Sequence, residues 1–307
     1  MESSSVAFLG PVASFSHQAA AEYFGSSATL LPHVSFGDAF ASVQNGTTDY
    51  AIIPCENSTN GSVVQTLDLL IDREDRYTDV KVVAEYYLTV HHCLLARKGA
   101  FPSYQRGETQ IAKLYTHLQA WGQCEIFLEK YCKGVERQDV SSTSKAGEIV
   151  SKETGEQSAA IASRFAAEHH GLDVLEENIE DKDDNTTRFL VLRNAKSDSG
   201  ARLPGEDSTT DATTTTQRSL FTFMVPQEAP GTLADALLIF KKHGMNITSI
   251  NTRPSQQKPW KYVFLVECDM ASTDQSQRAV ADILCGLRQV TEQCKYLGTW
   301  ANQLTKS

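Results

Sequence analysis

The sequence has no apolar run that approaches the roughly 18 to 20 residues a membrane-spanning helix requires, which argues against an integral membrane protein. It also has no basic stripe, because the net charge is -10 and the acidic residues are spread along the chain. Nucleic acid is therefore not expected as a partner. The same charge repels an anionic substrate at long range, so an anion site must be built from backbone N–H groups and one or two well-placed arginines.

Cysteine pairs with the spacing Cys-x-x-Cys are absent as well. The seven cysteines form an odd, scattered set, which is typical of free thiols in a reducing compartment. The chain runs into the strand-like segment Val6–Leu9 without a basic, apolar or arginine-rich leader. Together these observations favour the cytoplasm.

The histidines do not form a convincing metal site. His91-His92-Cys93 is a strand-like run and His169-His170 is an isolated pair. Adjacent strand residues point to opposite faces, and no second ligand pair completes a tetrahedral site. We predict no metal and no cofactor.

At 307 residues, the chain exceeds the size at which one hydrophobic core usually stops growing. Ser, Thr, Asp, Gly and Pro crowd between Asn194 and Gln217, so we predict a flexible linker at 194–217 between domains at 1–193 and 218–307. Before the linker, β-rich segments alternate with helical patterns, which indicates an α/β domain with a largely parallel sheet. The predicted strands are Val6–Leu9, Tyr50–Ile53, Lys81–Ala96, Glu136–Val140, Ala159–Ile161 and Thr187–Leu192.

The segment Lys81–Ala96 is too long for one ordinary strand, and we expect it to cross between two lobes separated by a cleft. After the linker, the pattern predicts a βαββαβ, ferredoxin-like unit. Its elements are Leu220–Val225, Thr232–His243, Asn246–Asn251, Tyr262–Cys268, Gln275–Gln289 and Lys295–Leu297.

Three polar turns precede predicted helices, where unpaired N–H groups and the helix dipole favour a carboxylate. They are Gly10–Ser16, Ile53–Ser62 and Val140–Ser144. Each turn alone is better explained as a helix N-cap, a role that Ser, Thr and Asn commonly perform. Because ligands of open α/β sheets bind beyond the carboxyl ends of strands, the three turns together favour a binding site. A fourth segment, Glu180–Leu192, is an acidic loop that runs into a strand at Arg188, which alone is equally well a solvated arginine.

Taken together, these segments resemble the prephenate dehydratase family over nearly the whole chain. The family's Gly-Pro-x-Gly-Thr-Phe-Ser is similar to Gly10–Ser16, with Ala13 and Ser14 replacing Gly and Thr. Its Pro-x-Glu-Asn-Ser-x-x-Gly matches Pro54–Gly61, and its Thr-Arg-Phe matches Thr187-Arg188-Phe189. Further matches are Asp68-Leu69-Leu70, Glu85, His92–Leu95 and Ser142-Thr143. The resemblance implies a fold similar to a type II periplasmic-binding protein, with a lobe switch near 80–90 and a return near 180–190.

The resemblance also implies the reaction. Prephenate becomes phenylpyruvate as the ring carboxylate leaves as CO2 and the ring hydroxyl leaves as water, so that the ring becomes aromatic. Thr187 is implied as the donor to the departing hydroxyl, Arg188 as a group that grips a carboxylate or makes that proton more available, and Phe189 as an apolar wall. The implied substrate-binding residues are Ser14, Phe15, Glu56, Asn57, Ser58, Ser142 and Thr143.

Residues 218–300 resemble an ACT domain, a ferredoxin-like amino-acid sensor. Pro230–Ala234 is similar to a Gly-Ala-Leu motif with Thr232 in place of Ala, and Asn246–Pro254 has Asn251-Thr252 where Glu-Ser is frequent. The resemblance implies L-phenylalanine as an allosteric effector bound between paired domains of a homodimer or homotetramer. The implied contacts are Gly231, Thr232, Leu233, Asn246, Ile247, Thr252, Arg253 and Pro254.

Two alternatives stay open. Arogenate dehydratase performs the same chemistry on the amino-acid analogue of prephenate, and the motifs do not separate the two activities. A non-catalytic sensor would join a two-lobed binding domain to an amino-acid-binding module. Such a sensor would not need Thr187, and its presence beside Arg188 and Phe189 favours the enzyme.

Overall fold

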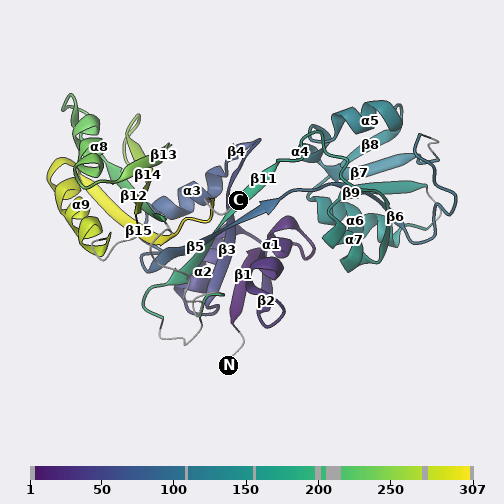
Figure 1. The fold of residues 1–307 in the computed structure, drawn as a ribbon, viewed down its shortest axis with the longest axis horizontal. Helices are drawn as coiled ribbons and strands as arrows, with labels where there is room; N and C mark the ends of the chain where they lie inside the picture. Colours follow the sequence, from purple (N-terminus) through teal and green to yellow (C-terminus); the bar gives the residue numbers. More distant parts are fainter. Residues whose placement is uncertain are drawn as a thin grey trace.

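The computed structural model describes residues 4–107, 110–154, 157–197, 202–204, 216–271 and 276–304. Figure 1 shows three bodies in a row: lobe 1 in the centre, lobe 2 at one end, and a C-terminal domain at the other. Most of the predicted linker at 194–217 lies outside the described residues.

Lobe 1 contains a mixed sheet in which β1 pairs in parallel with β2 and β3, whereas β11 pairs antiparallel with β3 and β5. In order across the sheet, the strands are β2 (Thr29–His33), β1 (Ser5–Leu9), β3 (Tyr50–Asn57), β11 (Thr186–Asn194) and β5 (Val80–Thr89), with β4 (Gly61–Ser62) paired to β3. The helices are α1 (Phe15–Phe24), α2 (Phe36–Gln44) and α3 (Val64–Ile71).

Lobe 2 contains a five-stranded sheet with a separate apolar core on each side. In order, its strands are β10 (Leu172–Glu176), β6 (Cys93–Arg97), β9 (Ser158–Ala162), β7 (Lys113–His117) and β8 (Glu136–Val140). Its helices are α4 (Leu118–Trp121), α5 (Glu125–Tyr131), α6 (Thr143–Lys152) and α7 (Arg164–His170).

Two strand connections join the lobes. The predicted long strand at 81–96 is divided between β5 in the lobe 1 sheet and β6 in the lobe 2 sheet, and β11 returns to lobe 1 (Figure 1). The returning strand lies between β3 and β5 in the sheet of lobe 1. The α/β class and the two-lobed architecture expected from the sequence are confirmed. The largely parallel sheet is not, because the strands that cross between the lobes pair antiparallel to their neighbours and make both sheets mixed.

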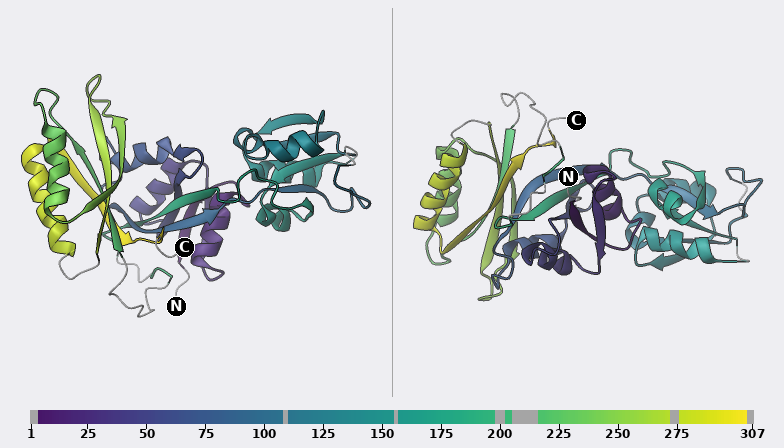
Figure 2. Two further views of the ribbon diagram at one scale, coloured as in Figure 1. Left: turned by 45° about the horizontal axis from the view of Figure 1, so that its top comes forward. Right: turned by 90° about the horizontal axis from the view of Figure 1, so that it is seen from below.

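The C-terminal domain is the expected ferredoxin-like unit, with the antiparallel strand order β13-β14-β12-β15. Its elements are β12 (Thr216–Met224), α8 (Thr232–Lys242), β13 (Asn246–Pro254), β14 (Tyr262–Ala271), α9 (Ser276–Val290) and β15 (Gln293–Ala301). Both views in Figure 2 show α8 and α9 on the outer face of this sheet, away from lobe 1.

The other face of the C-terminal sheet packs on lobe 1 and shares a hydrophobic core with it. That core includes Phe40, Leu70 and Val82 of lobe 1 together with Leu220, Leu265 and Trp300 of the C-terminal domain. Gly298 on β15 has φ +141°, and a Cβ placed there would lie 2.0 Å from the backbone oxygen of Val82 on β5. Only glycine therefore permits this approach of the two backbones.

One local expectation is wrong. The turn Ile53–Ser62 precedes helix α3 as expected, but it does not cap that helix, because β3 continues to Asn57 and forms a hairpin with β4. The N-cap of α3 is Val63, whose apolar side chain cannot accept a hydrogen bond. In the first turn of α3 the backbone N–H of Thr66 instead donates to the carbonyl oxygen of Val63 at 3.0 Å.

Candidate active site

The ends of β3 and β11 bring Asn57 and Thr187 into direct contact. These residues are paired in register, and Asn57 Nδ2 donates to Thr187 Oγ1 at 3.0 Å. The same amide donates to Asn185 Oδ1 at 2.8 Å, while its Oδ1 accepts from the backbone N–H groups of Thr59 and Asn60. Because Thr187 Oγ1 accepts one hydrogen bond, its own proton can be donated to another group.

Ser58 ties the β3 hairpin to the start of β11. Its backbone N–H donates to the carbonyl oxygen of Thr186 at 2.8 Å, and the backbone N–H of Thr186 donates to Ser58 Oγ at 2.9 Å. Glu56 is half-buried on β3 and pairs in register with Arg188. Three of the predicted site residues, Asn57, Ser58 and Thr187, therefore form one cluster.

The first polar turn lies against lobe 2. Ser14 caps α1 by accepting from the backbone N–H of His17, and its hydroxyl donates to the carbonyl oxygen of Leu9. Ala13 adopts φ +63° and is buried in a core cluster of lobe 2, so the left-handed turn forms although Ala replaces Gly there. The Phe15 ring meets the His92 ring edge-on, with centroids 5.7 Å apart.

The third polar turn faces the first across the lobes. Ser142 caps α6 by accepting from the backbone N–H of Lys145, and Thr143 is the first residue of that helix. Ser144 Oγ then donates to the carbonyl oxygen of Val12 at 2.7 Å. The N-termini of α1 and α6, where we predicted carboxylate contacts, thus lie on two turns that touch each other.

Arg188 and Phe189 lie behind Thr187 and are buried. The Arg188 side chain is 7% exposed, and its guanidinium contacts Glu85 on β5 and Glu267 on β14. Burial alone would lower the pKa of Arg188, but these carboxylates outweigh it, so the pKa is raised and the guanidinium stays charged. Phe189 belongs to a core cluster of lobe 1. Of the predicted catalytic triplet, Thr187 is the residue whose side chain contacts Asn57.

The predicted effector-binding residues lie on two elements of the C-terminal domain. Gly231 is the N-cap of α8 with φ +87°, followed by Thr232 and Leu233 in the first turn. Asn246, Ile247, Thr252, Arg253 and Pro254 lie on the edge strand β13. Arg253 pairs with both carboxylate oxygens of Asp68 on α3, each at 2.9 Å, and the carbonyl oxygen of Pro254 accepts from Arg73.

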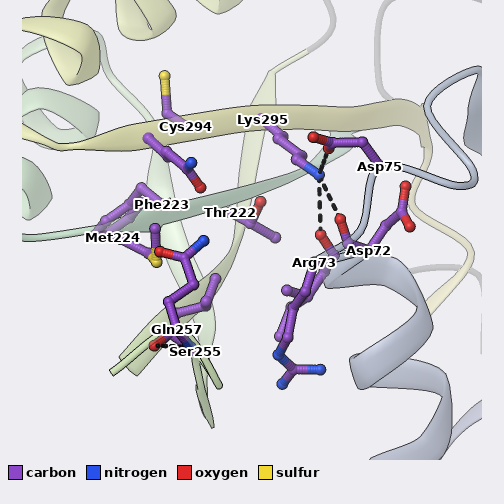
Figure 3. A pocket seen from close by; sticks show the side chains of 13 residues that line it. Asp72, Arg73, Asp75, Thr222, Phe223, Met224, Ser255, Gln257, Cys294 and Lys295 are labelled. Atoms are coloured by element: carbon purple, nitrogen blue, oxygen red, sulfur yellow. Dashed lines mark hydrogen bonds and ion pairs between the residues drawn. The ribbon is translucent and has the colours of Figure 1, made fainter. Parts of the chain in front are cut away.

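A cavity of about 190 Å³ lies between α3 and the C-terminal sheet, and Figure 3 shows the side chains that line it. Lys295 Nζ donates there to the carbonyl oxygens of Ile71 and Asp72, and it pairs with Asp75 at 2.6 Å (Figure 3). Asp72 in turn accepts from the backbone N–H groups of Arg76 and Tyr77. These groups are engaged with one another, so the cavity belongs to the junction of lobe 1 and the C-terminal domain.

The histidine pair at the lobe crossing has protein partners. His91 Nδ1 lies 2.6 Å from Glu180 Oε1, and His92 Nε2 lies 2.7 Å from Gln123 Oε1. Burial lowers the pKa of His92, which favours its neutral form. Within the described parts of the chain, no three His, Cys, Asp or Glu side chains are placed to hold a metal ion. No helix there is both long and apolar enough to cross a membrane.

Sequence reasoning missed the partners of two site residues. Asn185 lies in the polar segment Glu180–Leu192, but the sequence did not lead us to assign it a role. An amide two residues before Thr187 could have indicated a hydrogen-bond partner at the site. Glu85 was noted only as a match to the family, and Glu267 was not noted at all. Glu267 lies 79 residues from Arg188, a separation at which local sequence patterns predict no contact.

The chain thus combines a two-lobed α/β domain, in which strand ends meet around Thr187, with a C-terminal ferredoxin-like domain. Residues 6–197 match the family model for prephenate dehydratase. The chain belongs to the prephenate dehydratase family, whose members are carbon–oxygen lyases.

Relatives and solved structures agree with this assignment. The chain is 37% identical to a bifunctional chorismate mutase/prephenate dehydratase of Aquifex aeolicus, over 97% of this chain and 74% of the relative. It is 36% identical to a probable prephenate dehydratase of Saccharomyces cerevisiae, over 85% of this chain and 86% of the relative. A crystal structure of prephenate dehydratase from Arthrobacter aurescens in complex with L-Phe has a TM-score of 0.79 and 27% identity, covering 97% of this chain and 90% of that one.

Proposed function

We propose that Thr187 donates the hydrogen bond that assists departure of the prephenate hydroxyl, and that Asn57 orients Thr187 for this step. The observation that supports the proposal is the 3.0 Å hydrogen bond from Asn57 Nδ2 to Thr187 Oγ1. An alcohol is a weak acid, so it assists by a short, positioned hydrogen bond to the leaving oxygen or by relaying a proton. Loss of CO2 and water then makes the ring aromatic, which provides the driving force.

The two carboxylates of prephenate need separate binding groups. We assign them to the turns that contain Ser14 and Ser142, since both turns precede helices whose first N–H groups and dipole attract anions. Phe15 and Thr143 lie next to these caps, while Glu56 and Ser58 border the hydroxyl end of the site. Arg188 and Phe189 support Thr187 from the buried side of β11.

The test is phenylpyruvate formation from prephenate by the wild type and by Thr187→Ala. We expect Thr187→Ala to reduce kcat by about 10² to 10⁴, the range for loss of a positioned proton donor, while Thr187→Ser retains part of the activity. Thr186→Ala is the matched control, because the Thr186 hydroxyl donates to the carbonyl oxygen of Asp184 instead. A folded Thr187→Ala with wild-type kcat would contradict the role of Thr187. A wild type that turns over arogenate but not prephenate would reassign the substrate.

For the C-terminal domain we propose an ACT domain that binds L-phenylalanine and regulates the enzyme. The support is the ferredoxin-like topology, the motifs around Gly231 and Arg253, and the L-Phe complex of the Arthrobacter aurescens structure. The assignment fails if saturating L-phenylalanine changes neither activity nor thermal stability. We further propose a homodimer or homotetramer in the cytoplasm, which light scattering on the purified protein and fractionation of its source cells would test.

A further inference from the structure

Strand β11 contains Thr187 and, next to it, Arg188. The Arg188 side chain contacts a carboxylate of the C-terminal domain. Adjacent residues of a strand point to opposite faces. The Thr187 hydroxyl meets Asn57 at the hairpin, whereas the next residue, Arg188, directs its guanidinium toward β14 of the C-terminal sheet. The pairing of β11 with β3 shifts register between Arg188 and Phe189, which is a bulge of the kind that re-aims side chains.

Two carboxylates from different domains hold the Arg188 guanidinium. Its Nε donates to Glu85 Oε2 at 2.9 Å, and its Nη1 lies 2.9 Å from both carboxylate oxygens of Glu267. The side chains of Arg188, Glu85 and Glu267 are 7%, 0% and 10% exposed. Water therefore screens this contact little, and its geometry is fixed by the protein.

A second arginine and the C-terminal segment complete the network. Arg218 on β12 pairs with Asp269 at 2.9 Å and approaches Glu85 at 3.4 Å. The backbone N–H of Gln303 donates to Glu85 Oε1 at 2.9 Å. Residues of β12, β14 and the segment after β15 in the C-terminal domain thus contact Glu85 or Arg188 of lobe 1.

We propose that Glu267 is a positioning residue for the dehydration: it fixes Arg188, and through Arg188 it fixes the adjacent Thr187. This inference rests on the proposed role of Thr187. Glu267 pairs in register with Ser249 on β13, the strand that contains the predicted effector contacts Asn246 and Ile247. A shift of β13 and β14 on effector binding must either move Arg188 or leave buried charges unpaired, and the latter is strongly unfavourable.

The first measurement compares Glu267→Gln with Lys81→Met in steady-state kinetics on prephenate. Lys81 is the control because it also bridges the domains, donating to the carbonyl oxygen of Tyr296 at 2.8 Å from β5, but it does not touch Arg188. We expect Glu267→Gln to lower kcat about tenfold with KM changed less than about twofold, the pattern for loss of an interaction made in the transition state. Lys81→Met should keep wild-type kcat, and Glu267→Gln should also show a weaker response to L-phenylalanine.

A double-mutant cycle tests whether Glu267 acts through Arg188. If it does, adding Glu267→Gln to Arg188→Met changes kcat by less than about twofold. Effects that multiply would overturn the proposal, as would equal kcat for Glu267→Gln and Lys81→Met. If Glu267→Gln does not fold, Arg188→Lys replaces it, because an ammonium cannot bridge two carboxylates as a guanidinium fork does; unchanged kcat in Arg188→Lys would overturn the proposal. A wild type without prephenate turnover would instead overturn the proposed function itself.

Discussion

Lobe 1 has two neighbours and is joined to them in different ways. Toward the C-terminal domain it shares a hydrophobic core, a buried network of arginines and carboxylates, and the backbone approach at Gly298. Toward lobe 2 it is joined by two strand connections (Figure 2). Contacts of the Gly10–Ser16 turn, such as the hydrogen bond from Ser144 to the Val12 carbonyl, add to them. We therefore expect the first junction to be the more rigid of the two, and the second to allow the lobes to change their relative orientation.

This difference assigns different tasks to the two junctions. Substrate can be enclosed by motion of lobe 2, because the predicted binding turns lie on both sides of that junction. The regulation by L-phenylalanine proposed above would act through the first junction, where Arg188 contacts carboxylates of both domains.

The largest effect is expected at Glu85, the fully buried carboxylate of the rigid junction. Glu85→Gln removes the buried carboxylate that the guanidinium groups of Arg188 and Arg218 both contact, so we expect the free energy of unfolding to fall by about 3 to 5 kcal/mol. Glu125→Gln is the matched control in lobe 2, where the pair of Glu125 with Arg137 is solvent-exposed and contributes at most about 1 kcal/mol. Urea denaturation measures both, and equal losses would contradict the comparison.

The next effect concerns the close backbone approach of β15 to β5. Gly298→Ala places a methyl group where the Val82 oxygen lies, so we expect a loss of about 1 to 3 kcal/mol in the free energy of unfolding. Gly122→Ala is the control: its φ is -69°, and among the described residues no atom lies within 4 Å of the added carbon. If Gly298→Ala were as stable as the control, the junction would be more adaptable than proposed.

A smaller, pH-dependent effect is expected at Asp68, the partner of Arg253. Burial would raise the pKa of Asp68, but hydrogen bonds from Arg253 and Arg73 outweigh it, so the pKa lies below its ordinary value. Such a carboxyl stabilises the fold above its unfolded-state pKa of about 4, and this stabilisation is lost as the pH falls through the folded-state pKa. We expect Asp68→Asn to cost about 1 kcal/mol at pH 7.

The pH series supplies its own control. Denaturation of wild type and Asp68→Asn at pH 7, 5, 4 and 3 should give a difference that shrinks below about pH 4. A difference that stays constant down to pH 3 would mean that the charge of Asp68 does not provide the stabilisation.

The smallest change in global stability is expected at the junction of the lobes. Ser144→Ala removes the hydrogen bond to the Val12 carbonyl and should cost at most about 1 kcal/mol. Hydrogen exchange should nevertheless become faster in the turn at Gly10–Ser14, because the contact that orders it is lost. A stability loss equal to that of Glu85→Gln would refute the idea that this junction is loose.

Much of the fold was predictable because it follows from local patterns. The alternation of strands and helices indicated the α/β class, and the βαββαβ order of the last domain needed only periodicity. The long apolar run at 81–96 indicated a crossing between lobes, and the structure places its break at 90–92 between β5 and β6. The strands β2, β4, β7 and β10 were not predicted; β2 contains Pro32, which is unfavourable within a strand pattern, and β4 has only two residues.

The candidate site was predictable only in part. Ser14 and Ser142 were predicted as carboxylate contacts or N-caps, and the structure shows the caps, while their contact with substrate stays a prediction. The neighbours of Arg188 could not be predicted, because Glu85 and Glu267 reach it through the packing of two sheets. Charge alone could not reveal this, since a guanidinium on a strand is equally compatible with solvent, substrate or a buried partner.

The glycine at position 298 also limits how this protein can be recombined with others. A ferredoxin-like domain taken from another protein can be grafted onto this catalytic domain only if its last strand presents a residue without a side chain opposite Val82. Otherwise the grafted sheet would stand away from lobe 1, and its counterpart of Glu267 would not reach Arg188. Chimeras selected for a new effector should therefore retain glycine at this position, even where the rest of the transplanted domain has diverged.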